Sequence, residues 1–262
     1  LFVPVEQADK VNKYIGATGE NAPPLTRLGS GDWNRVTSEA RKESLIIAKE
    51  LLELYALRET AKGFAHKHED ERMHEFEAGF GYVETPGQLK ATEEILRDME
   101  KERPMDRLLC GDVGFGKTEV AMRAAFKAFL NGKQVAVLAP ITILVDQHYH
   151  SFQKRMEAFG IRVGMISRFN SPVEQKATIA KLTTGDVDVI IGTHRLFQSD
   201  VVFKDLGLVI IDEEQRFGVK QKEKLKALRH SVDILTLTAT PIPRTLNMSL
   251  SGLRDISTIT TP

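Results

Sequence analysis

The stretch RLLCGDVGFGKTEVAMRAAF, residues 107–126, decides the fold of this chain. Its apolar start is typical of a strand, its middle has the spacing Gly111-x-x-x-x-Gly116-Lys117-Thr118, and its end is typical of a helix. A glycine-rich loop in that context places backbone N–H groups and a helix N-terminus around phosphate oxygens. A glycine-rich turn with a chance lysine is the alternative, and the flanking strand and helix argue against it.

This loop supplies the first candidate site residues. We expect Lys117 to reach the β- and γ-phosphates of a nucleotide and Thr118 to ligate Mg²⁺. The residues expected to contact the nucleotide are Gly111, Asp112, Val113, Gly114, Phe115, Gly116, Lys117, Thr118 and Glu119.

Short apolar runs alternate with segments long enough for helices from about residue 107 onward. The runs are residues 107–110, 134–139, 162–166, 187–192, 206–212 and 233–239. Near-continuous apolar strands are typical of a parallel sheet that is covered on both faces. We therefore predict an α/β doubly wound domain, with a mostly parallel sheet and helices on both faces.

The composition is that of an ordinary globular chain of 262 residues. Lys+Arg and Asp+Glu are both 36, so the net charge of zero argues against coating nucleic acid by bulk charge, but a local basic face is still allowed. No apolar run approaches the ~20 residues of a membrane span, and no secretory leader opens the chain. The one cysteine, Cys110, cannot form an internal disulfide. We expect a cytoplasmic protein without a membrane partner, and the initial Leu1 suggests an excised piece.

The upstream part has a different pattern. Residues 1–35 combine a short strand-like run with a Gly/Pro-rich linker, and residues 36–62 have the periodicity of a long helix that stops at Gly63. The polar run that follows, up to residue 78, is expected to be a solvated helix or a loop. We predict three parts, 1–35, 36–78 and 79–262, with the second acting as a connector.

A second motif, LVIIDEEQRFG, places two carboxylates at the end of an apolar run. Asp212 is in the position of a Walker B residue, which holds Mg²⁺ directly or through water. Glu213 is then placed to orient and deprotonate the attacking water. Gln215 can hydrogen-bond between the acidic pair and its neighbours, and its amide does not titrate near neutral pH.

A third motif follows the next apolar run. Thr238, Ala239 and Thr240 form a TAT sequence, whose small hydroxyl residues can bond to the acidic pair and sense the γ-phosphate. TAT alone is a weak signal. The phosphate loop and the acidic motif together indicate a nucleoside triphosphatase, and TAT after GKT and DEEQ, in that order, is diagnostic.

In that order, GKT, DEEQ and TAT resemble motifs I, II and III of superfamily 2 helicases and translocases. The resemblance implies a RecA-like lobe, and it extends to the loops that hold the nucleic-acid backbone in that superfamily. The residues that match those loops are Pro140, Thr142, Arg168, Phe169, Thr193 and His194. Upstream, GFGYVETPGQ resembles a Q motif, which implies that Gln88 reads adenine, that Phe80 or Tyr82 packs near the base, and that ATP is the nucleotide.

Two families of that superfamily share GDVG-GKT and TATPIPRTL. The chain resembles the bacterial transcription-repair coupling factors almost residue by residue, including GLRDIS and Arg244 after the third motif. The branch-migrating recombination helicases typically have Ser in place of Phe115 and Gln-His in place of Glu214-Gln215. The resemblance covers nearly the whole chain.

The coupling-factor resemblance implies an ATP-driven translocase on double-stranded DNA. Such a protein displaces stalled RNA polymerase, which it holds mainly through an upstream module, and it recruits excision-repair proteins. The chain ends at TITTP, where a first motor lobe ends, so we expect a monomeric fragment that binds ATP and hydrolyses it poorly. Absence of an arginine finger can cost ~10³–10⁵ in rate.

Two other functions are compatible with the same motifs. A fork-remodelling helicase would use the same engine, and a partner-binding scaffold would not need hydrolysis. The pair His148 and His150 suggests a metal site, but i, i+2 spacing places the two side chains on different faces of a helix. The Mg²⁺ that accompanies ATP is the one ion expected.

Overall fold

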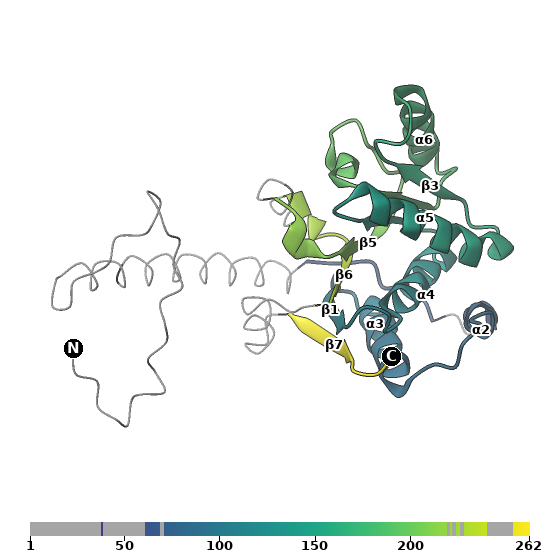
Figure 1. Ribbon diagram of the computed structural model, residues 1–262, viewed down its shortest axis with the longest axis vertical. Coiled ribbons are helices and arrows are strands. Elements are labelled where there is room, and N and C mark those ends of the chain that lie inside the picture. Colours follow the sequence, from purple (N-terminus) through teal and green to yellow (C-terminus); the bar gives the residue numbers. More distant parts are fainter. Residues whose placement is uncertain are drawn as a thin grey trace, which may run out of the picture. The chain divides into compact units, whose positions relative to one another are not determined.

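A parallel sheet of seven strands forms the centre of the described structure (Figure 1). The strands are β1 (Asp106–Gly111), β2 (Gln134–Leu138), β3 (Val163–Ile166), β4 (Val189–Gly192), β5 (Leu206–Asp212), β6 (Asp233–Thr238) and β7 (Asp255–Ile259). Their order across the sheet is β3-β4-β2-β5-β6-β1-β7, and every pairing between them is parallel. The predicted α/β architecture is confirmed.

The computed structural model describes residues 38, 61–68, 71–218, 221, 224–225, 228–239 and 254–262. All but the first of these lie in one compact unit, Leu52–Pro262. The strand and linker predicted for 1–35, and most of the helix predicted for 36–62, lie outside the described residues, as do Thr240 and Arg244. Residues 61–68 contain neither helix nor strand.

Six of the seven strands coincide with the predicted apolar runs, and β7 does not. Its sequence, DISTI, has three polar residues in five and no two apolar residues in succession. β7 pairs with β1 from Arg107↔Asp255 to Gly111↔Ile259. It closes the β1 side of the sheet, and so the strand that leads into the phosphate loop has a neighbour on each side.

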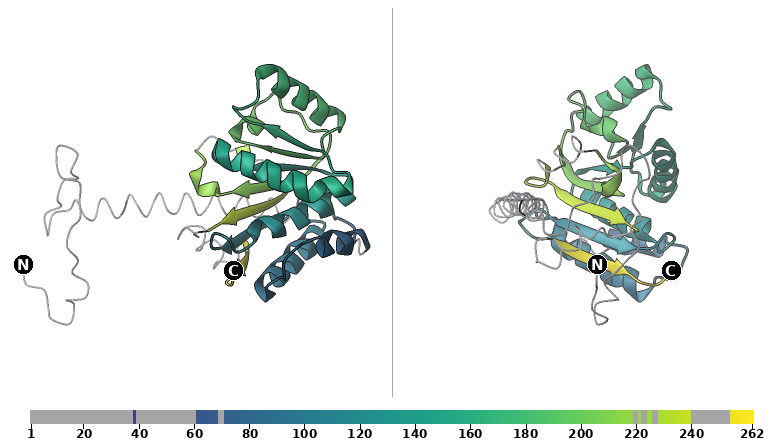
Figure 2. Two further views of the ribbon diagram at one scale, coloured as in Figure 1. Left: turned by 45° about the vertical axis from the view of Figure 1, so that its right-hand side comes forward. Right: turned by 60° about the vertical axis from the view of Figure 1, so that its left-hand side comes forward.

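Helices pack along the sheet (Figure 2). Their bounds are α2 (Glu71–Ala78), α3 (Pro86–Met99), α4 (Lys117–Leu130), α5 (Thr142–Met156) and α6 (Pro172–Thr184), with short 3-10 turns η2 (Glu157–Phe159), η3 (His194–Phe197) and η4 (Glu214–Arg216). Alternate strand residues point to opposite faces. Val137 belongs to the hydrophobic cluster that includes α3, α4 and α5, whereas Leu138 belongs to the cluster that includes Leu182 of α6. Both faces are therefore covered. No described helix is long and apolar enough to cross a bilayer.

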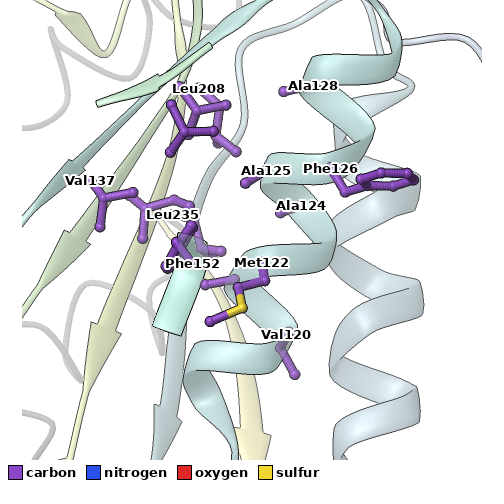
Figure 3. Close-up of a cluster of buried hydrophobic side chains, with 14 of the residues drawn as sticks. Val120, Met122, Ala124, Ala125, Phe126, Ala128, Val137, Phe152, Leu208 and Leu235 are labelled. Atoms are coloured by element: carbon purple, nitrogen blue, oxygen red, sulfur yellow. The ribbon is translucent and has the colours of Figure 1, made fainter. Parts of the chain in front are cut away.

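The α4 helix lies against the centre of the sheet (Figure 3). Ala121, Ala124, Ala125 and Ala128 are fully buried, and these small side chains allow the helix to approach the strands closely. Because α4 begins at the phosphate loop, this packing fixes the direction in which the N-terminus of the helix points.

The α2 helix corrects one prediction. The polar run was expected to be solvated, but Met73 and Phe76 are buried. Phe76 stacks on Phe126 of α4, with ring centroids 4.2 Å apart, and the guanidinium of Arg155 lies over its ring at 3.9 Å. Two apolar residues three positions apart are enough to bury one face of this eight-residue helix.

Candidate functional site

The three predicted motifs meet at one edge of the sheet. Gly111 ends β1, Asp212 ends β5 and Thr238 ends β6, and these strands are adjacent in the order β5-β6-β1. Because all three strands run in the same direction, the loops that follow them emerge side by side. This is the position at which ligands bind in open parallel sheets.

The phosphate loop needs glycine at two positions. Gly114 and Gly116 have left-handed backbones, with φ of 86° and 78°. At Gly116, which is the N-cap of α4, a Cβ atom would also overlap the side-chain amide of Gln88. The loop is thus a tight turn that leads directly into the N-terminus of α4.

Lys117 faces this loop. Its ammonium donates hydrogen bonds to the carbonyl oxygens of Gly111 and Asp112, at 2.5 and 2.8 Å. Thr118 is half-buried in the first turn of α4, and Asp112 and Val113 are exposed. A positive side chain, a turn of free glycine backbone and a helix N-terminus form a cradle that fits the phosphates of a nucleotide.

Two predicted nucleotide contacts have other partners. The carboxylate of Glu119 lies 3.0 Å from the guanidinium of Arg155 and 3.3 Å from that of Arg123. Gln88 donates from Nε2 to the carbonyl of Phe115 at 3.1 Å, while its Oε1 accepts from the N–H of Thr85 at 3.0 Å. Gln88 therefore joins the start of α3 to the phosphate loop. The sequence carried a signal for this, because Thr85-x-x-Gln88 has the spacing of a capping box.

Phe80 lies on the segment between α2 and α3. It is half-buried, its ring centroid is 5.4 Å from that of Tyr82, and the guanidinium of Arg123 lies 5.7 Å from its centre. Tyr82 is 79% exposed, so an aromatic face is accessible next to Phe80.

The acidic motif at the end of β5 is held by its neighbours. Glu213 has a left-handed backbone, with φ 53° and ψ 54°, which is costly for a residue with a side chain. Its Oε1 accepts from the N–H of Ala239 at 3.0 Å, and its Oε2 accepts from the amide of Gln215. The second and third motifs are thus in direct contact through the N–H of Ala239. Asp212 has a different partner, since its Oδ2 lies 2.9 Å from Nε2 of His148 on α5.

Behind this motif lies an ion-pair network that sequence reasoning did not find. Glu214 is 2.7 Å from Arg229 and 3.2 Å from Arg254, and Asp106 is 3.0 Å from both arginines. Burial disfavours the charge of Glu214, but the two guanidinium groups lower the pKa of its carboxyl below the usual range. No sequence signal was available, because the partners are far apart along the chain and meet only through the sheet.

A groove of about 410 Å³ lies at the other half of the same sheet edge. It follows the ends of β2, β3 and β4, which are neighbours in the sheet. Its lining residues are Pro140, Ile141, Thr142, Ser167, Arg168, Gln175, Thr193, His194 and Arg195. Five of the six residues predicted to contact nucleic acid are among them. The sixth, Phe169, is outside this lining and is 59% exposed.

The charges of the groove lining have one sign. Arg168, His194 and Arg195 are its ionisable residues, and none of its nine residues is acidic. Arg195 is held by Asp200, with N–O distances of 2.7 and 2.6 Å. Gln175 donates to the carbonyls of Ser167 and Asn170 and thereby shapes the loop after β3. A chain with no net charge therefore has a local basic groove, which suits an anionic ligand.

The chain matches known proteins over most or all of its length. Residues 85–249 match the family model described as DEAD/DEAH box helicase. The whole chain is 56% identical to the transcription-repair-coupling factor of Bacillus subtilis (strain 168), and 53% identical to that of Staphylococcus aureus (strain USA300). It covers 22% of each of these proteins, so it spans about a fifth of the length of the curated relatives it matches.

Two solved structures have the same fold. RecG bound to a three-way DNA junction is 38% identical, with a TM-score of 0.67, and the match covers 81% of this chain and 30% of that one. A hypothetical ATP-dependent RNA helicase from Sulfolobus tokodaii is 16% identical, with a TM-score of 0.54. The match covers 74% of this chain and 57% of that one. The second likeness shows the fold alone.

The predicted resemblance to the coupling factors is confirmed by these relatives, and the predicted RecA-like lobe by the parallel sheet and its helicase neighbours. The family match at residues 85–249 takes in more than half of the chain and contains the phosphate loop, the acidic motif and the basic groove. The chain therefore belongs to the DEAD/DEAH box helicase family.

Proposed function

We propose that this chain is the ATP-binding motor lobe of a double-stranded DNA translocase. The proposal places Mg²⁺-ATP at the ends of β1, β5 and β6, and the DNA backbone along the ends of β2, β3 and β4. One observation carries it: three loops distant in sequence form a basic groove on the same sheet edge as the phosphate loop. That arrangement allows one lobe to sense both ligands.

The roles of the chain's residues follow from their positions. Bound ATP supplies the phosphoanhydride bond, and Mg²⁺ supplies charge neutralisation. Lys117 and the N–H groups of the phosphate loop bind the phosphates. Thr118 and Asp212 are the oxygen ligands offered to the ion. Glu213, which Ala239 and Gln215 hold in place, orients the attacking water and accepts its proton.

The 262 residues alone are expected to be a weak ATPase. In this class of enzyme an arginine finger raises the rate by a factor of ~10³–10⁵. The chain covers 22% of the length of its relatives, so most of their length is outside it. We propose ATP binding with slow turnover for the isolated chain, and fast turnover for the native polypeptide that carries it.

For the native polypeptide, we propose displacement of stalled RNA polymerase in the cytoplasm, followed by recruitment of excision-repair proteins. Its support is the 56% identity to a transcription-repair-coupling factor over all 262 residues. A second candidate is fork remodelling, which is favoured by the 38% identity to RecG, a protein solved with a three-way DNA junction.

The test uses RNA polymerase stalled on a DNA template. The native polypeptide and ATP are added, and release of the transcript is followed, with Glu213→Gln as the control. Release that needs both ATP and Glu213 would support the coupling role. Absence of release, together with ATP-dependent regression of a branched fork, would favour fork remodelling as the function. Release that persists in Lys117→Ala would instead indicate a scaffold.

A further inference from the structure

We propose that His148 is a positioning residue that couples occupancy of the basic groove to the Asp212 carboxylate. This inference rests on the proposed function, because it assigns Asp212 to the Mg²⁺ of ATP and the groove to DNA. It adds a physical connection between the two sites through a residue for which the sequence predicts no role toward ATP or DNA.

The contact itself is well defined. Nε2 of His148 lies 2.9 Å from Oδ2 of Asp212, and the two side chains are 12% and 14% exposed. With an ionised Asp212, which can only accept a hydrogen bond, Nε2 is the donor of this contact. Phe152, one turn along the helix, meets the imidazole edge-on with ring centroids 6.4 Å apart. The imidazole is thus held by packing on one side and by the carboxylate on the other.

The α5 helix brings this contact within reach of the groove. Ile141 and Thr142, at the start of α5, line the groove, and His148 lies six residues further along. At 1.5 Å per residue this is about 9 Å along the helix axis. Val145 and Phe152, 0% and 1% exposed, anchor the helix in the core on either side of His148 along the chain.

Asp212 belongs to a different element, the central strand β5. A small shift or rotation of α5, when a phosphodiester backbone occupies the groove, therefore changes the geometry between the imidazole and the carboxylate. Partners that hydrogen-bond to a metal-ligating carboxylate set the direction of its oxygens. In this way the groove reaches the metal ligand without passing through the phosphate loop.

The chain offers a matched control on the same helix. His150 is 68% exposed, and Nδ1 of its ring contacts the carbonyl oxygen of Asp146 within α5. The i, i+2 spacing places the two histidines on different faces, as the sequence predicted. Replacement of His150 perturbs the helix similarly, but it leaves the contact with Asp212 intact.

The experiment measures ATP turnover by the native polypeptide, with and without duplex DNA, over a range of Mg²⁺ concentrations. His148→Ala is expected to lower DNA-stimulated turnover, and to raise the Mg²⁺ concentration needed, by about tenfold. His148→Gln, whose amide N–H reaches as far as Nε2, should retain most of the DNA-stimulated turnover and need about the same Mg²⁺ concentration as the wild type. His148→Asn is too short and should resemble His148→Ala, and His150→Ala should resemble the wild type.

A second measurement does not depend on turnover. Hydrogen exchange of residues 213–216 is followed on addition of duplex DNA without nucleotide. DNA should slow this exchange in the wild type and in His148→Gln, but not in His148→Ala or His148→Asn, while DNA affinity remains unchanged. Thermal melting checks the folding of each variant, and the Gln/Asn pair decides the test if the Ala variant does not fold.

The outcomes separate this inference from the function on which it rests. Normal DNA stimulation and normal exchange in folded His148→Ala or His148→Asn would overturn the coupling role. An equal loss of turnover with and without DNA would also overturn it, since His148 would then only orient Asp212. Full turnover in Glu213→Gln would instead mean that the proposed ATPase site is wrong.

Discussion

Replacement of Gly116 by alanine tests the account of the phosphate loop. Gly116 has φ 78°, and an added Cβ would overlap the side-chain amide of Gln88. Gly114→Ala is the matched control: its φ is 86°, but an added Cβ would have no described atom within 4 Å. The two variants therefore share the backbone cost and differ in the collision.

The magnitudes follow from these contacts. A left-handed backbone costs a residue with a side chain about 1–2 kcal/mol, so Gly114→Ala should lower the free energy of unfolding by about that amount. At Gly116 the displaced Gln88 also loses its bonds to Phe115 and Thr85, each worth about 1 kcal/mol. Gly116→Ala should therefore cost about 3–4 kcal/mol in total.

The assay is urea unfolding of the 262-residue chain, followed by circular dichroism, with Gln88→Ala as a second background. Because the collision needs the Gln88 side chain, Gly116→Ala should cost only about 1–2 kcal/mol in that background. The double-mutant cycle then gives the coupling between the two residues directly.

Equal costs for Gly116→Ala and Gly114→Ala would refute the reasoning. So would additivity of Gly116→Ala and Gln88→Ala, because the two side chains would then not compete for the same space.

Three further predictions concern other parts of the chain. Arg254→Met leaves the buried Asp106 and the half-buried Glu214 without one of their arginines, and should lower the free energy of unfolding by about 3–5 kcal/mol in urea titrations; a loss below about 1 kcal/mol would contradict the network. Burial opposes ionisation of Asp98, but Lys101 and Arg107 lower its pKa, so its carboxylate stabilises the fold above pH 3.8 and this contribution is lost as pH falls through the lowered pKa. The difference in unfolding free energy between wild type and Asp98→Asn should accordingly be large at pH 7 and shrink below pH 3.8, and a constant difference would count against the ion pair. Arg168→Ala should weaken duplex DNA binding alike for all sequences and reduce the slope of log affinity against log salt by about 1, as measured by fluorescence anisotropy; an unchanged slope would remove Arg168 from the phosphate contacts.

Much of the fold could be predicted because its strands are buried on both faces. A run such as LGLVIID has no polar residue before its end, so its position is evident without knowledge of its partners. β7 could not be found this way, because it lies at the margin of the sheet and two of its five residues are buried. Its place depends on pairing with β1, which is a tertiary property.

The candidate site, too, could be predicted only in part from the sequence. Motif spacing identified the phosphate loop and the acidic pair, and five of the predicted backbone contacts do line one groove. Their roles toward ATP and DNA remain predictions. Contacts such as His148 with Asp212, or Arg254 with Glu214, join segments that no local pattern relates. The role of Gln88 toward adenine also remains a prediction, and the structure adds the capping box that Gln88 forms with Thr85.

The position of β1 has a consequence for biosynthesis. β1 ends at Gly111, and its neighbours β6 and β7 begin at Asp233 and Asp255. At about 5–20 residues per second, a ribosome needs roughly 6–24 s to add the first of these partners after β1 has been made. During that interval an apolar strand with two unpaired edges, together with the glycine loop that follows it, has no native place to dock. The nascent chain must therefore be shielded from aggregation for seconds before its nucleotide site can form.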